Sequence, residues 1–313
     1  MNSKKNFIGI IIINYNQNKY TLHCLQSIDK YVRNKLSFKV YLIDNNSEMP
    51  IDEEKINSFP FPTEYIKNNK NQGFAEGNNI GIRKALTDGC NYIALINNDT
   101  AFVDNSLFSA VKMMDDNNKI GIAGIVNYCY DNSDQIMQSG RNIILSKGKN
   151  VVVDFDINSK FPVYCDYVPG SSFIVKREVI DKIGLLDVDY FAYYEEADFC
   201  LRAKDQGYNT AFLPSSKILH KEGLSSGLSI KLYLRTRNEL KFYKKNVSSV
   251  NFIFLYFKIF FKPFVKFVLL DRYKILYLKI LIIAYYDFHK NNYGEGSLEY
   301  IRKLLFFQKT RSI

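Results

Sequence analysis

The chain has 313 residues and is 47% hydrophobic and 15% aromatic, a composition that supports a large buried core and excludes a disordered chain. Its five cysteines are scattered without a C-x-x-C pair, which excludes a disulfide framework or a cysteine zinc site and predicts reduced thiols in a cytosolic protein. The net charge of +10 is concentrated at one end, because residues 217–313 carry 19 Lys and Arg against 6 Asp and Glu.

Strands and helices are expected to alternate along the first third of the chain. Continuous apolar runs, typical of strands buried on both faces, lie at 7–13, 38–43 and 92–96. Apolar residues at helical spacing lie at 20–32, 77–86 and 107–114. This alternation predicts an α/β fold with a doubly wound, mostly parallel sheet. In such sheets ligands bind beyond the carboxyl ends of the strands, where Asn14, Asp44 and Asp99 are expected.

Later elements are expected to be shorter. Residues 121–169 read as irregular strands with turns, and short helices are expected at 179–183 and 195–204. From residue 229 onward the sequence changes to long aromatic and basic segments.

Two polar turns are candidates for binding a nucleotide. The Asp44 carboxylate could accept hydrogen bonds from a base N–H or from ribose hydroxyls, although Asp and Asn also favour ordinary turns. The segment 71–79 reads NQGFAEGNN and leads into a helix. Its glycines allow close backbone approach, and the helix N-terminus favours anions. An ordinary loop with a helix cap is the alternative interpretation.

A metal site is indicated by an acid that follows the strand at 92–96. Asp99 ends the sequence Asn97-Asn98-Asp99, and hard cations such as Mg²⁺ or Mn²⁺ take carboxylate and phosphate oxygens. One carboxylate needs further ligands, and His220 follows a short apolar stretch. A neutral imidazole suits Mn²⁺ better than Mg²⁺. A lone histidine, however, is more often structural than a ligand.

Three acids open the helix expected at 195–204. Glu195, Glu196 and Asp198 stand within four residues, and their mutual repulsion favours proton acceptance. Acids that complement the helix dipole are the alternative. Asp198 and Arg202 are spaced i,i+4 and are expected to form a structural ion pair, which leaves Glu195 and Glu196 as candidate bases.

Taken together, these motifs resemble the inverting glycosyltransferase family 2, especially its rhamnosyltransferase-like members. The matching segments cover about residues 7 to 240 and read IIIINYN, LIDNNS, NQGFAEGNNIGI, LINNDT, PGSSFIVKREVIDKIGLLD, FAYYEEADFCLRAKDQGY and ILHKEG. The resemblance implies a GT-A fold and a nucleotide-sugar donor, UDP- or dTDP-linked.

The resemblance also implies roles for individual residues. Those that would contact the nucleotide sugar are Asn14, Asn16, Asp44, Asn46, Asn71, Gly73, Asn78 and Asn97. Asp99 matches the last acid of the family's D-x-D metal motif, His220 matches a later metal-ligating histidine, and Glu196 falls at the catalytic base. Two departures stand out, because Asn97 replaces the first acid of D-x-D and Glu196 replaces the usual Asp. Glu195 stays open as the base.

The implied enzyme is a metal-dependent, non-processive hexosyl- or deoxyhexosyltransferase that uses Mn²⁺ or Mg²⁺. Its catalytic domain is expected at 1–228, with a nucleotide-sugar half at about 1–100 and an acceptor half at about 101–228. The implied acceptor is a saccharide, lipid-linked in cell-surface polysaccharide synthesis such as O-antigen or capsule assembly. A processive synthase would carry Q-x-x-R-W, and this chain has no Trp. A non-catalytic sugar-nucleotide-binding scaffold is the alternative, suggested by Asn97.

The remaining segment, 229–313, is expected to be a helical, basic-aromatic extension. Lys258, Lys262 and Lys266 are four apart and should share one helix face, which Pro263 should kink or divide. Basic aromatic helices favour anionic membrane surfaces, so a peripheral position on the inner face of the cell membrane is expected. Packing on the catalytic domain or a homodimer interface is the alternative. Cations beside bulky apolar groups argue against nucleic acid, and no run reaches the ~18 apolar residues of a membrane span.

Overall fold

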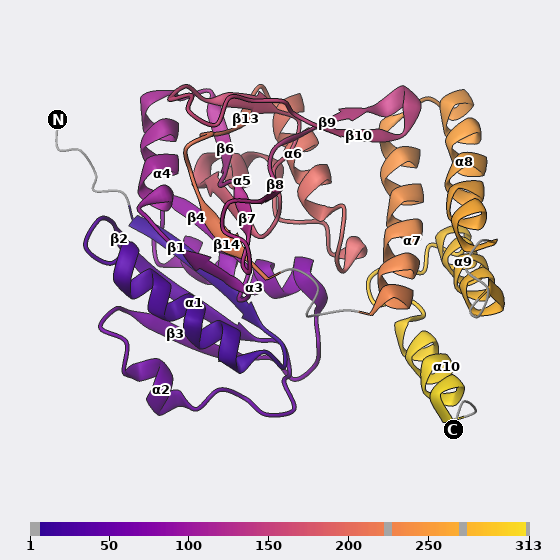
Figure 1. Ribbon diagram of the computed structural model, residues 1–313, viewed down its shortest axis with the longest axis horizontal. Coiled ribbons are helices and arrows are strands. Elements are labelled where there is room, and N and C mark those ends of the chain that lie inside the picture. Colours follow the sequence, from indigo (N-terminus) through magenta and orange to yellow (C-terminus); the bar gives the residue numbers. More distant parts are fainter. Residues whose placement is uncertain (1–6, 222–226, 269–273, 311–313) are drawn as a thin grey trace. The chain divides into compact units, whose positions relative to one another are not determined.

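The structure is a computed structural model that describes residues 7–221, 227–268 and 274–310, without the side chains of 262–268, 274 and 306–310. The chain divides into two compact units (Figure 1). Unit 1 contains the described parts of 1–142, 151–186 and 196–224, and unit 2 contains 143–150, 187–195 and the described parts of 225–313. Segments 143–150 and 187–195 thus belong to unit 2, although they lie inside the range expected for the catalytic domain.

An eight-stranded sheet forms the centre of unit 1, in the order β11-β13-β6-β12-β4-β1-β2-β3. Its strands are β1 (Phe7–Asn14), β2 (Ser37–Asp44), β3 (Thr63–Lys67), β4 (Tyr92–Ile96), β6 (Ile120–Gly124), β11 (Val163–Cys165), β12 (Ser172–Lys176) and β13 (Asn209–Phe212). β12 is antiparallel to β4 and β6, and β11 is antiparallel to β13. The other pairs are parallel, which confirms the predicted mostly parallel α/β sheet.

Helices cover both faces of this sheet. They are α1 (Asn18–Tyr31), α2 (Glu53–Asn57), α3 (Gly73–Thr87), α4 (Ser106–Asp116), α5 (Arg177–Ile183) and α6 (Glu195–Asp205). Alternate residues of a strand point to opposite faces. Ile10 of β1 therefore joins a core with residues of α1, α2 and α4, whereas Ile11 joins a core with residues of α3, α5 and α6. Burial on both faces explains why β1 is a continuous apolar run.

A second, smaller sheet of unit 1 has the order β5-β14-β7-β8. Its strands are β5 (Thr100–Phe102), β7 (Asn127–Cys129), β8 (Ile136–Gln138) and β14 (Ile218–His220). β14 pairs antiparallel with β5, with His220 opposite Thr100. This pairing brings His220 to the strand that follows Asp99.

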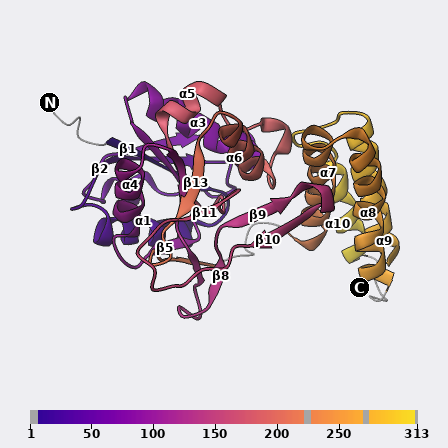
Figure 2. The same cartoon turned by 90° about the horizontal axis from the view of Figure 1, so that it is seen from above.

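Unit 2 is mainly helical, which confirms the predicted helical C-terminal part. Its helices are α7 (Leu228–Asn246), α8 (Ser249–Val268), α9 (Lys274–His289) and α10 (Leu298–Thr310). A hairpin of β9 (Arg141–Ile144) and β10 (Lys149–Val152) also reaches into this unit, with its turn η1 (Leu145–Lys147) (Figure 2). A second short turn, η2 (Val188–Tyr190), precedes α6. α7 packs against the other three helices around buried residues such as Tyr233, Ile280 and Leu298.

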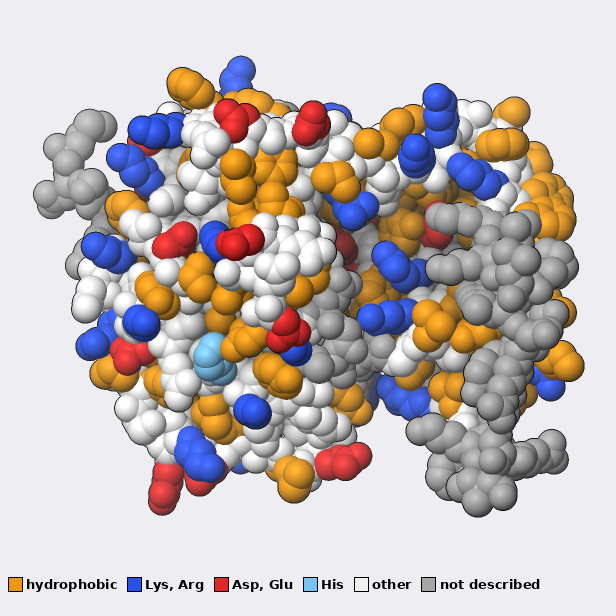
Figure 3. All heavy atoms as spheres, viewed as in Figure 1, with side chains coloured by type: hydrophobic (Ala, Val, Ile, Leu, Met, Phe, Trp, Pro, Cys, Tyr) orange, Lys and Arg blue, Asp and Glu red, His pale blue; other side chains and the backbone are white. Residues whose placement is uncertain are grey.

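Helix α8 of unit 2 contains the core of the predicted basic-aromatic segment. α8 continues through Pro263, so this proline does not divide the helix. The Lys258 ammonium donates a hydrogen bond to the Lys147 carbonyl, and the side chains of Lys262 and Lys266 lie outside the described set. Five apolar side chains of α8 are 53–78% exposed: Val250, Ile253, Phe254, Phe257 and Phe261. Figure 3 shows hydrophobic and basic side chains together on the visible face of this unit. Among the described helices, none is both long and apolar enough to cross a membrane.

Candidate active site

The ends of β1 and β2 form the first part of the site. Asn14 lies opposite Asp44 in the parallel register, and its Nδ2 donates to Asp44 Oδ2 at 2.9 Å. Asp44 Oδ1 also accepts the Ser47 backbone N–H at 2.7 Å. Asn14 is fully buried and Asp44 is 2% exposed. The two predicted residues are therefore neighbours, and their side chains also bond to each other and to this turn.

The other two asparagines of these turns face solvent. Asn16 and Asn46 are exposed and have φ angles of 55° and 68°, in the left-handed region that Asn tolerates better than most residues. Asn16 Oδ1 accepts the Glu48 backbone N–H at 2.8 Å, which ties the two strand ends together. Of the residues predicted at these two strand ends to contact the nucleotide sugar, Asn16 and Asn46 are thus the accessible ones.

The glycine turn before α3 is held by asparagines. Gly73 begins the helix with φ 75°, and its N–H donates to Asn71 Oδ1 at 2.9 Å. Asn45 Nδ2 donates to Asn71 Oδ1 and to the Gly73 carbonyl, both at 3.0 Å, and the Asn45 oxygen accepts the Gln72 N–H. Asn45 was not among the predicted site residues. It joins the polar turn after β2 to the glycine turn, and its position inside the Asp-Asn-Asn-Ser sequence was the available signal.

Farther along α3, two adjacent asparagines have different partners. Asn78 is 2% exposed, and its Nδ2 donates to the Phe74 carbonyl of the same helix at 2.9 Å. Asn79 bonds Leu186 in both directions, donating to its carbonyl at 2.9 Å and accepting its N–H at 3.1 Å. Asn79 therefore ties α3 to the segment after α5, a role that the sequence did not indicate.

Asp99 and His220 meet at the edge of the small sheet. His220 Nε2 lies 3.2 Å from Asp99 Oδ1, and the residues are 5% and 9% exposed. The Lys221 backbone N–H donates to the Asp99 carbonyl at 2.9 Å, which fixes the two strands in register. His220 Nδ1 is buried and has no hydrogen-bond partner among the residues that the structure describes, and the buried Asp99 Oδ1 has the His220 Nε2 contact alone among them.

These two side chains fit a divalent cation. Buried polar atoms without partners are rare in native proteins and call for a bound species. One carboxylate and one imidazole are ligands that suit Mn²⁺. Within the described residues, no cluster of three or more His, Cys, Asp or Glu could hold a metal. Asp99 and His220 would therefore hold an ion only together with oxygens from a substrate.

Asn97 connects this pair to the turn before β12. The Asn97 backbone N–H donates to the Ser171 carbonyl at 3.0 Å, and its carbonyl accepts Thr100 Oγ1 at 2.7 Å. Ser171 in turn bonds Asn127, which is fully buried. The Asn97 side chain is partly exposed, so the residue that replaces the first acid of D-x-D remains accessible.

Gly170 lies between the start of α3 and the start of α6. A methyl group on Gly170 would lie 3.3 Å from the Phe74 ring and 3.9 Å from Glu196 Cβ. Glycine therefore allows these three segments to approach one another. Through Ser171 the same turn reaches Asn97, so unit 1 brings Glu196, the glycine turn and the metal pair into one connected region.

The three acids in the first turn of α6 differ in their partners and in their exposure. Asp198 is 1% exposed and bonds Arg202 Nε at 2.8 Å, which confirms the predicted structural ion pair. Arg202 also donates to the Ile183 carbonyl at 2.6 Å. Glu195 is 4% exposed, whereas Glu196 is partly exposed. Greater access favours Glu196 over Glu195 as the group that meets an acceptor.

The segment before α6 has unusual backbone geometry. Phe191, Tyr193 and Tyr194 have φ angles of 60°, 72° and 78°. A residue with a side chain in such a sparsely populated region costs of order 1–3 kcal/mol, and such strain clusters at functional sites. No glycine marks this segment in the sequence, so its left-handed geometry could not be predicted from the residue types.

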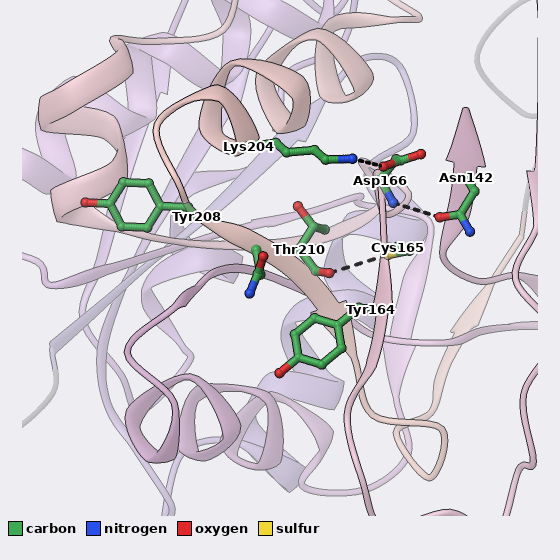
Figure 4. Close-up of a pocket in the computed structure, with 8 residues that line it drawn as sticks. Asn142, Tyr164, Cys165, Asp166, Lys204, Tyr208 and Thr210 are labelled. Carbon is green, nitrogen blue, oxygen red and sulfur yellow. Dashed lines mark hydrogen bonds and ion pairs between the residues drawn. The ribbon is translucent and has the colours of Figure 1, made fainter. Parts of the chain in front are cut away.

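A hollow of about 200 Å³ lies elsewhere in unit 1, on β11 and β13. Figure 4 shows the Lys204–Asp166 ion pair (2.7 Å) beside Asn142, with Tyr164 and Thr210 nearby. None of the predicted site residues lines it. Lys204 and Asp166 neutralise each other there, and Asn142 Oδ1 accepts the Asp166 backbone N–H at 3.1 Å, so we assign the hollow no part in the active site.

Comparisons with known proteins identify relatives of the sequence. Residues 9–184 match the family described as glycosyl transferase family 2. The chain is 25% identical over 261 residues to the dTDP-rhamnosyl transferase RfbF of Shigella flexneri, covering 76% of this chain and 80% of that protein. It is 31% identical over 61 residues to the N-acetylglucosaminyl-diphospho-decaprenol L-rhamnosyltransferase of Mycobacterium tuberculosis, which is 20% of each chain.

Solved structures share the fold. GalNAc-T7 with UDP, GalNAc and Mn²⁺ superposes with a TM-score of 0.62 at 17% identity, covering 75% of this chain and 48% of that one. The mannosyltransferase PcManGT from Pyrobaculum calidifontis, in complex with GDP-Man and Mn²⁺, has a TM-score of 0.57 at 13% identity, covering 90% and 74%. These neighbours confirm the predicted GT-A fold. The chain spans about half the length of the GalNAc-T7 structure.

Proposed function

The chain belongs to glycosyl transferase family 2, and from that premise we propose that it is a metal-dependent, inverting, non-processive hexosyl- or deoxyhexosyltransferase. The donor in this proposal is a UDP- or dTDP-sugar, and the acceptor is a hydroxyl of a lipid-linked saccharide. As a rhamnosyltransferase-like family member it is a glycosyltransferase that acts on nucleotide sugars in glycan biosynthesis. The names of two relatives, which specify a dTDP-rhamnosyl donor and a decaprenol-linked acceptor, support the finer choices.

The observation that carries the proposal is the buried Asp99–His220 pair, in which His220 Nδ1 has no hydrogen-bond partner among the described residues. Asp99 and His220 would hold Mn²⁺ or Mg²⁺, and the bound ion would neutralise charge on the leaving diphosphate. The Mn²⁺ in both of these neighbouring structures supports the choice of metal. The turns at Asp44 and Gly73 would receive the nucleoside and the donor sugar.

The transfer itself requires a base near the acceptor hydroxyl. In our proposal Glu196 takes the hydroxyl proton as that oxygen attacks the anomeric carbon, on the face opposite the diphosphate. A single displacement of this kind inverts the configuration. The contact region of Glu196, Gly170 and Phe74 supports this assignment, since Phe74 stands in the first turn of α3 beside the glycine turn.

The exposed apolar side chains of α8 support a proposal for where the reaction takes place. The apolar side chains Ile253, Phe254, Phe257 and Phe261 are more than half exposed on α8, at the spacing of one helix face. With the net charge of +13 after residue 216, this composition favours an anionic membrane surface. We therefore place the enzyme peripherally on the inner face of the cell membrane, in O-antigen or capsule synthesis. This surface would bring a lipid-linked acceptor within reach.

The decisive experiment is a panel of dTDP-rhamnose, UDP-sugars and GDP-mannose with Mn²⁺. A true donor should raise the melting temperature in proportion to its affinity and should release nucleoside diphosphate. Both effects should shrink in EDTA. Binding without any release, with and without a saccharide acceptor, would instead favour the non-catalytic scaffold, and neither effect with any donor would overturn the proposal.

A further inference from the structure

The loop that precedes α6 needs something to hold it. Phe191, Tyr193 and Tyr194 occupy the left-handed region without a glycine among them. L-residues leave this region readily unless surrounding contacts fix them. The loop belongs to unit 2 as part of segment 187–195, so the restraining contacts within that unit are informative.

The side chain of Asn238, on α7, donates hydrogen bonds to several backbone carbonyls of this loop. Asn238 is fully buried, and its Nδ2 donates to the carbonyl oxygens of Tyr190, Ala192 and Tyr193 at 2.7, 2.8 and 2.9 Å. A single amide group thus binds three carbonyls within four consecutive residues. The three carbonyls can point toward one amide because the backbone reverses direction in this loop. The residues with positive φ angles make this reversal.

Arg237 fixes the direction of that amide. Its Nε and Nη2 donate to Asn238 Oδ1 at 3.1 and 3.0 Å. Because the amide oxygen faces the guanidinium, the amide NH₂ must face the loop. Arg237 Nη2 also lies 3.4 Å from the Tyr190 carbonyl, so the two residues act on the same segment.

The network continues to a buried acid. Arg237 Nη1 donates to the Tyr233 hydroxyl at 3.3 Å, and that hydroxyl donates to Asp287, which is fully buried. Burial raises the pKa of Tyr233 to about 12, so the phenol keeps its proton at neutral pH. Gly296 packs directly against this network, because a methyl group there would clash with the Tyr233 oxygen.

One turn later on α7, Lys241 reaches the start of the loop. Its ammonium bonds Asp189 and lies 3.2 Å from Asp187. The α7 face formed by Arg237, Asn238 and Lys241 therefore contacts the segment from Asp187 to Tyr193. The next residues along the chain are Tyr194 and then Glu195, the first residue of α6.

We propose that Asn238, oriented by Arg237, is a positioning residue that holds the left-handed loop and thereby sets the first turn of α6, where the candidate base stands. This inference rests on the proposed function for the identity of the reaction. Only one residue separates the carbonyl of Tyr193 from Glu195, so the chain itself transmits the restraint. In this proposal the helical unit contributes to transfer through geometry and touches no substrate at this point.

The test compares Asn238→Ala with Asn246→Ala on the same helix. Asn246 donates only to the Phe242 carbonyl of α7 in the described structure, so it matches residue type and helix without touching the loop. We expect Asn238→Ala to speed hydrogen exchange in 189–196 and to lower turnover of dTDP-rhamnose with Mn²⁺ by about 10²-fold, with KM for the donor little changed. Asn246→Ala should change neither. Unchanged exchange in 189–196 would overturn the proposal, and this readout needs no substrate.

A double-mutant cycle separates positioning from general damage. If Asn238 acts through the base, Asn238→Ala should cost little further turnover in a Glu196→Gln background. If the double variant instead loses turnover by the product of the two single-variant factors, the proposal is overturned. Should Asn238→Ala not fold, Arg237→Lys keeps the charge but loses the two-nitrogen grip on Asn238, and the same exchange and cycle apply. Full turnover of both Glu196→Gln and Glu195→Gln would instead contradict the proposed function, whatever Asn238→Ala does.

Discussion

The two units differ in the kind of side chain that they offer to a binding partner. In the metal pair of unit 1, His220 Nδ1 is buried without a hydrogen-bond partner among the described residues, and Asp99 Oδ1 has the 3.2 Å contact with His220 Nε2. The buried charges of unit 2 are arranged differently, since Asp287 accepts from Tyr233, Asn292 and Ser297. Helix α8 of unit 2 exposes a row of apolar side chains. Unsatisfied polar atoms indicate a charged ligand, whereas exposed apolar side chains indicate an apolar surface.

The largest effect is expected at the Asp99–His220 pair of unit 1. Asp99→Ala should lower turnover by about 10³-fold, because it removes the anionic member of the metal pair. It should leave stability nearly unchanged, since burying the Asp99 carboxylate is costly and its side chain gains the 3.2 Å contact with His220 in return. Nucleoside diphosphate release and urea unfolding measure the two effects. Asp134→Ala, at an exposed acid of unit 1, is the control, and full activity of Asp99→Ala or of wild type in EDTA would sink the metal assignment.

Asp287→Ala should show the opposite behaviour. The substitution leaves the Tyr233 hydroxyl and the Ser297 N–H without their acceptor, which should lower the free energy of unfolding by about 3 kcal/mol. Chemical denaturation with Glu295→Ala as the control measures this, because Glu295 is exposed and its ion pair with Arg302 (3.5 Å) should contribute little. A stability loss below that of the control would show that the buried network of unit 2 is not a scaffold.

Glu196→Gln tests the base within unit 1. The amide keeps the shape of the carboxylate and cannot take a proton, so turnover should fall by about 10²-fold with donor affinity unchanged. Glu178→Gln, at an acid in the first turn of α5, is the matched control for charge and position. If Glu195→Gln is the inactive variant and Glu196→Gln is active, the two roles are reversed.

The smallest effect is expected at the exposed apolar side chains of α8 in unit 2. Replacing Phe254, Phe257 and Phe261 with Ser should weaken binding to anionic vesicles while leaving donor hydrolysis largely intact. Phe161→Ser, at a 79% exposed phenylalanine of unit 1, is the control. Vesicle co-sedimentation at low and high salt measures the change, and each nearby cation should add about 1 kcal/mol at low salt. Equal pelleting of variant and wild type would favour packing or a homodimer.

Much of unit 1 was predictable from the sequence, because local pattern and fold agree there. The Ile-rich strand at 7–13, the strand at 92–96 and the helix at 107–114 appear within three residues of their expected bounds. Parallel strands end at one edge of a sheet, so the meeting of Asn14 and Asp44 followed from their positions at strand ends. The order of the motifs likewise identified the family.

Tertiary structure alone decided what depends on contacts distant in sequence. The approach of His220 to Asp99 needs the pairing of β14 with β5, and neither short strand has a periodicity that predicts its partner. The roles of Asn45, Asn79 and Asn238 depend on which carbonyls lie nearby, which no local pattern encodes. The left-handed loop before α6 is set by contacts from α7 against the preferences of its own residues. Sequence determines which groups are available, and packing determines which of them remain without partners.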